Sequence, residues 1–262
     1  MGSQGKSAAD CGHTNHRRLS MKSMIAALVF ASHTLANAGM PADIVFWTVA
    51  TVPGKVTTSG SEIHLNGDID ARIASTVVDL IARRGYDTLR IQSESGNAFA
   101  ARAIGAAVFD HQITVVVTGS CSSSCARYIF TAAKHKRIEP DAVVMFSDYK
   151  NYRDYVQGLQ QLSEKRRLNG ASALSDREKQ MLSMQEKWAG LENDYFTKID
   201  VDMRIASVGY VADKSASYWL LSKAGMAEFG VSNVTAPDDY GSEAYCDKMK
   251  ISGLVRFDAQ CL

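Results

Sequence analysis

Short apolar runs alternate with longer amphipathic segments along most of the chain. The short runs, which are rich in β-branched residues, predict strands at residues 44–49, 62–67, 88–91, 113–118 and 142–146. Apolar residues at helical spacing predict helices over residues 70–84, 97–110 and 123–136. Strand–helix–strand units of this length imply parallel strands joined by right-handed crossovers. The pattern therefore predicts a single α/β domain.

Residues 150–205 differ from this pattern. They are rich in Gln, Lys, Arg and Glu, and their apolar residues recur at helical spacing. They predict a pair of helices that turns near Asn169–Gly170, and Ser175 with Glu178 forms a helix-start signature. Two interpretations stay open: an amphipathic hairpin packed on the core, or a dimerisation arm that would make the protein a homo-oligomer.

The N-terminal segment has the three parts of a secretory signal peptide. Basic residues precede an apolar run at residues 24–31, which is followed by the small-residue site Ala36-Asn37-Ala38. The run is too short to span a bilayer. We therefore predict cleavage after Ala38, with Met21 as the alternative start, and a mature domain of residues 39–262 without an integral membrane segment. An N-terminal anchor or a buried helix is the competing interpretation.

Composition and charge exclude several classes of protein. With 46% hydrophobic and 22% charged residues, the chain is not a disordered protein. The net charge of the whole chain is +1, and it becomes −2 when the basic segment of residues 1–38 is removed. A nucleic-acid-binding protein needs a surplus of Lys and Arg, so no nucleic-acid partner is expected.

Cleavage also removes Cys11 and leaves an even number of cysteines. The remaining four are Cys121, Cys125, Cys246 and Cys261. An exported protein lies in an oxidising compartment, so disulfides are expected, with three connectivities open. We favour one bond between Cys246 and Cys261, which would hold the C-terminal tail of residues 237–262, and one between Cys121 and Cys125. Metal binding is the competing interpretation, but the spacing lacks a partner cluster.

Two small-residue turns follow neighbouring predicted strands, one at residues 93–97 and one at residues 119–126. The carboxyl ends of parallel strands share one edge of a sheet, so both turns can face one cleft. A serine at the start of a helix there would have backbone N–H groups and the helix dipole beside it. A serine-rich helix cap with a purely structural role is the alternative.

Four blocks of sequence resemble the Clp-protease/crotonase superfamily, in particular its exported serine-peptidase-like branch. The blocks are Ile63-His64-Leu65-Asn66-Gly67-Asp68-Ile69, Leu89-Arg90-Ile91-Gln92-Ser93-Glu94-Ser95-Gly96-Asn97, Val117-Thr118-Gly119-Ser120-Cys121-Ser122-Ser123-Ser124-Cys125, and residues 218–231. The resemblance implies a spiral of parallel strand–helix units with a helical excursion at about residues 150–205. The paired cysteines of the third block are typical of the periplasmic members.

The resemblance also implies roles for individual residues. Ser123 falls on the nucleophile, and Ser95, Gly96 and Ser124 fall on the oxyanion hole. Two departures stand out: Glu94-Ser95 replaces Pro-Gly, and Ser147-Asp148 stands where the Clp proteases carry their base histidine. A serine needs an adjacent base to become nucleophilic.

Substitute bases are few. Signal-peptide peptidases of this superfamily use a lysine, and Lys150 lies just beyond the same strand. The histidines are poorer candidates: His64 is expected to be structural, His111 to lie at the opposite edge of the sheet, and His135 to lie on the surface of the helix that begins at Ser123. Asp213 could orient a base, but none is identified for it.

These residues lead to one favoured function and two alternatives. The favoured function is a periplasmic or secreted serine hydrolase with a degenerate base, which acts on a peptide or protein and needs no metal or cofactor. A catalytically inactive protein that binds a peptide or partner in the same cleft is the first alternative. An acyl-thioester enzyme is the second, and it is disfavoured because an exported protein meets little coenzyme A.

Overall fold

The computed structural model describes residues 52–262, apart from residues 84, 148–149, 208–217 and 256–258. The expected signal peptide with its alternative start, and the expected strand at residues 44–49, lie outside the described residues. Nine strands form one sheet in the described part of the chain. They are β1 (Lys55–Ser59), β2 (Glu62–Asn66), β3 (Thr88–Ser93), β4 (Thr114–Ser122), β5 (Lys136–Ile138), β6 (Val143–Ser147), β7 (Tyr218–Leu220), β8 (Val234–Thr235) and β9 (Ala259–Cys261).

The sheet is mixed and mostly parallel. Strands β2, β3, β4 and β6 are parallel neighbours, whereas β1 is antiparallel to β2 and β7 is antiparallel to β6. Strand β4 pairs with β5 through residues 115–117 and with β6 through residues 120–122. The prediction of an α/β domain is confirmed.

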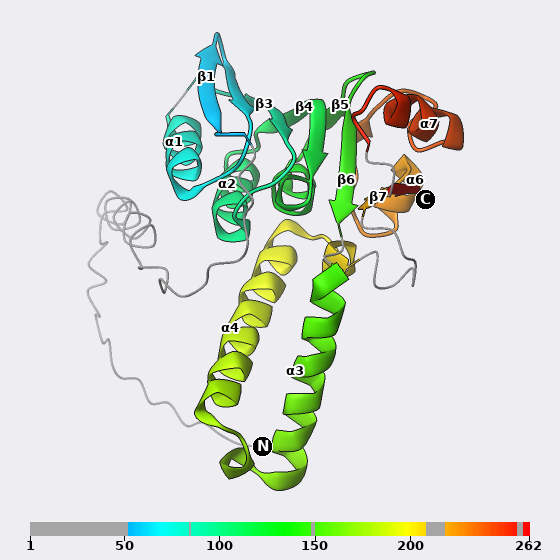
Figure 1. Ribbon diagram of the computed structural model, residues 1–262. Coiled ribbons are helices and arrows are strands. Elements are labelled where there is room, and N and C mark those ends of the chain that lie inside the picture. Colours follow the sequence, from blue (N-terminus) through cyan, green and yellow to red (C-terminus); the bar gives the residue numbers. More distant parts are fainter. Residues whose placement is uncertain (1–51, 84, 148–149, 208–217, 256–258) are drawn as a thin grey trace, which may run out of the picture. The chain divides into compact units, whose positions relative to one another are not determined.

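Helices α1 (Ala71–Ala82) and α2 (Ala98–Asp110) lie side by side against one face of this sheet (Figure 1). Each begins at a residue whose side chain accepts hydrogen bonds from the first turn: Asp70 for α1 and Asn97 for α2. Alternate residues of the strands, among them Ile63, Leu89 and Val115, are fully buried in the same core. Strand periodicity thus directs every second side chain toward the helices.

A π-helix, η1 (Cys125–Phe130), follows β4 and packs against α2. The prediction of one helix over residues 123–136 is wrong at its end, because the chain leaves the helix and residues 136–138 form β5. His135 therefore precedes a strand, where its carbonyl accepts a hydrogen bond from the amide of Val115 (3.0 Å).

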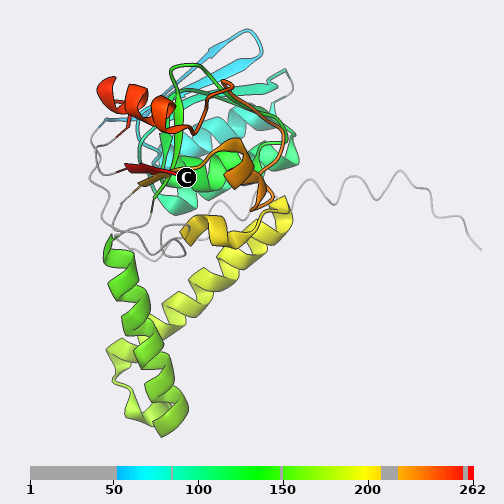
Figure 2. The same ribbon diagram turned by 90° about the vertical axis from the view of Figure 1, so that its right-hand side faces the viewer.

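Two long helices, α3 (Lys150–Asn169) and α4 (Asp176–Ile199), form a hairpin whose turn passes through Gly170 and a short 3₁₀ segment, η2 (Ala171–Ala173). Ser175 and Glu178 form a reciprocal capping box at the start of α4. Figure 2 shows, as Figure 1 does, that the hairpin turn lies away from the sheet, while the C-terminal end of α4 reaches it.

The C-terminal region returns to the sheet after a 3₁₀ segment, η3 (Met203–Ser207). Helices α6 (Lys223–Ala227) and α7 (Glu243–Ile251) precede β9, which pairs in parallel with β7. A disulfide joins Cys246 in α7 to Cys261 in β9, and a second joins Cys121 to Cys125. Both favoured cysteine pairings are therefore present.

Replacing Cys246 and Cys261 together by alanine is expected to lower the free energy of unfolding by about 3 kcal/mol, because a bond that closes a loop of this length restricts the unfolded chain. Urea unfolding of the variant and the native protein, both oxidised, measures the difference. Adding a reductant to the variant then isolates the contribution of the bond between Cys121 and Cys125. An unchanged urea midpoint in the double-alanine variant would contradict the prediction.

Candidate functional site

The chain turns from β4 into η1 through Ser123, which has a left-handed backbone conformation with φ of +55°. This conformation is costly for a residue other than glycine, and it persists only where the surroundings hold it. Two hydrogen bonds do so: the Ser123 amide donates to the carbonyl of Met145 (3.0 Å), and the Ser123 carbonyl accepts from the amide of Arg127 (2.9 Å). The serine turn, residues 119–125, is thus a strained and firmly held junction between a strand and a helix.

A covalent bond closes the same turn. The disulfide links Cys121 at the end of β4 to Cys125 at the start of η1, with 5.3 Å between their Cα atoms, and both side chains are fully buried. Ser123 is the middle residue of the loop that this bond closes. The bond therefore restrains the backbone on both sides of the serine.

Ser147, the last residue of β6, donates its hydroxyl to the Ser123 Oγ at 3.1 Å. Both residues are almost fully buried, with 7% and 5% of their surface exposed. The register of β4 and β6 places the two serines near each other, because Ser122 pairs with Met145, one residue before Ser123 and two residues before Ser147. Ser147 thus touches Ser123, but a neutral hydroxyl is not a base at ordinary pH.

The turn at residues 93–97 joins the serine turn. Ser124 donates its hydroxyl to the carbonyl of Gly96 (3.0 Å), and Ser95 donates its hydroxyl to Asp68 (2.6 Å). Glycine is required at position 96, because a Cβ there would lie 2.6 Å from the Cβ of Ile69. The structure therefore brings Ser95, Gly96 and Ser124 into one neighbourhood with Ser123.

Arg127 is a residue of this site that the sequence pattern did not identify. Its guanidinium donates to the carbonyl of Ser147 (3.0 Å), while its amide donates to the carbonyl of Ser123. One residue thus holds both serines from the first turn of η1. The sequence feature that could have identified Arg127 is its position as an arginine inside an otherwise apolar segment, four residues after Ser123.

Glu192 was missed as well. It lies on α4, has 6% of its surface exposed, and accepts hydrogen bonds from Arg102 of α2 and Tyr128 of η1, both at 3.0 Å. Burial raises the pKa of Glu192, and burial also raises the pKa of Tyr128 above its usual range. The buried carboxylate joins the end of the hairpin to the helix that carries Arg127.

Lys136 is a buried lysine whose position relative to Ser123 the structure gives. Lys136 is buried, and desolvation lowers its pKa to about 8. Its ammonium donates to the carbonyls of Ala133 and Ser232, and its strand pairs with β4 at Val115, the end remote from Ser123. Lys136 is therefore not a base for Ser123.

The three histidines of the described chain also lie elsewhere: His64 is in the middle of β2, His111 ends α2, and His135 precedes β5. Lys150 is the first residue of α3, three positions after Ser147, but its side chain lies outside the described residues. Asp213 lies outside them too. The candidate base thus stays a prediction.

In the described part of the chain, no three His, Cys, Asp or Glu side chains gather closely enough to hold a metal ion. No helix among the described residues is both long and apolar enough to cross a membrane. Comparison of the sequence with models of known protein families found no match, and comparison with curated proteins found no significant similarity.

Proposed function

We propose that this protein is an exported serine hydrolase of the peptidase type, on a Clp-protease/crotonase-like fold. In this proposal Ser123 Oγ attacks a carbonyl carbon of the substrate, its proton passes to a base and then to the leaving group, and water hydrolyses the resulting acyl-enzyme. The observation that carries the proposal is the left-handed conformation of Ser123 at a strand-to-helix turn. Strain of this kind is typical of functional residues.

The surroundings of Ser123 support the same chemistry. The turn precedes η1, so the positive end of a helix lies beside the hydroxyl and would stabilise a developing oxyanion. The hydrogen bond from Ser124 to Gly96 draws the second turn toward the first, and the backbone N–H groups of these two residues are the proposed oxyanion hole. The two disulfides support export, since such bonds persist in oxidising compartments.

Lys150 is the proposed base. It is the first residue of α3 and comes three positions after Ser147, the last residue of β6, and this closeness in sequence supports the choice. A lysine acts as a base only when its neutral form is populated, which requires desolvation or a neighbouring positive charge. We therefore expect Ser123 to react only while the Lys150 side chain is uncharged.

Labelling with a fluorophosphonate probe tests the nucleophile. The native protein is expected to form one covalent adduct, and Ser123→Ala is expected to form none, because the probe bonds only to an activated serine. Ser172→Ala removes a hydroxyl from the hairpin turn and serves as the matched control, with labelling equal to that of the native protein. Lys150→Gln should slow labelling by about 10²-fold, the usual contribution of a general base.

One observation favours the alternative of a catalytically inactive binding protein. Ser147, which is no base, fills the place next to Ser123 that the resemblance assigns to a histidine. If the folded protein forms no Ser123-dependent adduct between pH 6 and 10, the hydrolase proposal fails and the binding function is favoured.

A further inference from the structure

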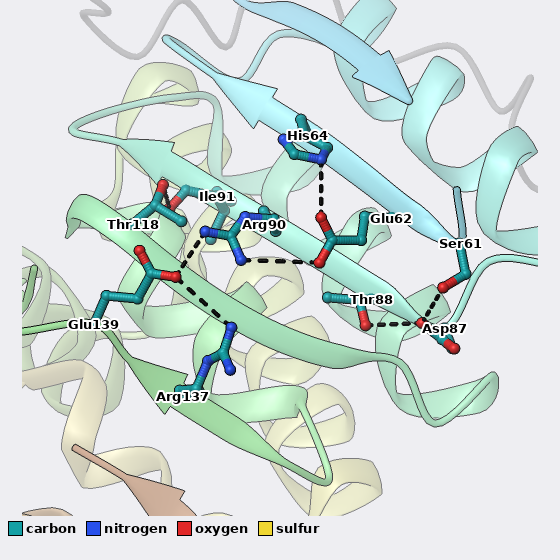
Figure 3. Close-up of polar contacts among 10 residues, drawn as sticks. All are labelled: Ser61, Glu62, His64, Asp87, Thr88, Arg90, Ile91, Thr118, Arg137 and Glu139. Carbon is teal, nitrogen blue, oxygen red and sulfur yellow. Dashed lines mark hydrogen bonds and ion pairs between the residues drawn. The ribbon is translucent and has the colours of Figure 1, made fainter. Parts of the chain in front are cut away.

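A polar surface covers the face of the sheet that points away from α1 and α2. The alternation that buries Ile63, Leu89 and Val115 directs Glu62, His64 and Arg90 to this opposite face, where Arg137 and Glu139 of the β5 region join them (Figure 3). None of these five residues takes part in the contacts around Ser123 described above.

A pocket of about 260 Å³ opens on this surface. Its polar lining comes from four adjacent strands and includes Lys55, Thr57, His64, Arg90, Gln92 and Thr118. Gly119, the residue after Thr118, leaves room for the side chain of Gln92, because a Cβ there would lie 2.7 Å from its amide carbon. With Asn66 included, the lining combines two cations, an imidazole, two amides and two hydroxyls within one small volume.

The side chains with a permanent charge that line the pocket are both cationic. None of the described residues that line the pocket is acidic, and no described carboxylate lies within ion-pair distance of Lys55, which is exposed. Arg90 is already held by Glu139 (2.6 Å), and its other terminal nitrogen lies 3.8 Å from Glu62 (Figure 3). A guanidinium has five N–H donors, so these two pairs fix its plane and leave donors for a ligand.

The imidazole of His64 lies beside Glu62, with its Nε2 3.1 Å from the carboxylate, but the geometry is not that of a hydrogen bond (Figure 3). Glu62 and Glu139 therefore hold Arg90 in place without lining the pocket. Groups held in advance by such contacts lose little freedom when they bind a ligand.

We propose that this pocket is an anion-binding site for a small molecule that carries a carboxylate or phosphate group together with hydroxyl groups. Arg90 and Lys55 would bind the anionic group through charge-assisted hydrogen bonds, and Thr57, Thr118 and Gln92 would bind the remaining polar groups. The pocket volume suits a ligand of metabolite size. The site is separate from Ser123 and does not depend on hydrolase activity.

Isothermal titration calorimetry with two probes, citrate and inorganic phosphate, tests this site on the purified protein. At least one probe is expected to bind with one-to-one stoichiometry, and the stronger of the two identifies the anionic group. Lys55→Gln is expected to weaken binding about tenfold through loss of one charge-assisted hydrogen bond. Lys55 is exposed on the edge strand β1, so this variant should unfold at the native temperature.

A matched variant separates a site from general attraction of anions. Lys187→Gln removes the same charge from an exposed position on α4, and it should bind the probe as the native protein does. Ser123→Ala should also bind normally, which distinguishes this site from the proposed hydrolase site. Equal weakening by both lysine variants, or no binding of either probe by the native protein, would overturn the proposal.

Discussion

Replacing Glu192 by alanine is expected to lower the free energy of unfolding by about 3–5 kcal/mol, because it leaves a buried positive charge without its partner. Arg102 has only 12% of its side chain exposed, and Glu192 Oε1 is its ion-pair partner at 3.0 Å. The guanidinium also lies over the rings of Phe99 and Trp188, 5.2 and 5.0 Å from their centres, so it cannot easily move into water. Urea unfolding followed by circular dichroism measures the loss.

The hairpin offers a matched control in Glu186→Ala. Glu186 lies on the same helix and pairs with Arg166 at 2.5 Å, but 57% of its side chain is exposed. An exposed pair contributes about 0–1 kcal/mol, so this variant should unfold near the native midpoint. Equal losses in the two variants would contradict the view that burial makes the Glu192 contact important.

Glu192→Gln separates charge from hydrogen bonding at the same position. The amide keeps an acceptor for Arg102 and for the hydroxyl of Tyr128, but it lacks the negative charge. We expect Glu192→Gln to lower the free energy of unfolding, but by less than Glu192→Ala does. A glutamine variant as unstable as the alanine variant would assign the whole effect to the charge.

The local spacing of apolar residues predicted most of the central sheet. It failed where hydrogen bonds between residues far apart in the sequence decide the structure. Strands β2, β3, β4 and β6 and helices α1 and α2 follow the apolar periodicity closely. The spacing of apolar residues predicts one helix over residues 123–136, which would place His135 and Lys136 on its last turn. Residues 136–138 instead form β5, since hydrogen bonds to β4 and β8 exist only in the folded sheet.

The same limit applies to the candidate site around Ser123: its local turns were predictable from the sequence, but its contacts between distant residues were not. Sequence alone brings the two turns to one sheet edge, because parallel strands end together, and it selects Ser123 by the resemblance of the turn. The contact between Ser147 and Ser123 depends on the register of β4 with β6, which no local pattern fixes. Glu192 meets Tyr128 across 64 positions of sequence, so no spacing within one helix reveals it.

Replacing Ser147 by histidine is expected to raise the rate at which a fluorophosphonate probe labels Ser123 by about 10²-fold or more. Ser147 already touches the Ser123 hydroxyl at 3.1 Å, so a side chain at this position is directed at the atom that must lose a proton. Burial at position 147 favours the neutral form of an imidazole, which can accept that proton. The rate should therefore rise as the pH increases toward 7 and then level off.

Two controls show that the imidazole acts as a base. Ser147→Gln adds a side chain of similar length that cannot accept the proton, and it should label no faster than the native protein. Ser147→His combined with Ser123→Ala should form no adduct. Because position 147 is buried, Ser147→Gly with added imidazole supplies the same base without crowding the core. If neither the folded histidine variant nor imidazole accelerates labelling, Ser123 is not poised for attack, and the strained turn then supports binding rather than catalysis.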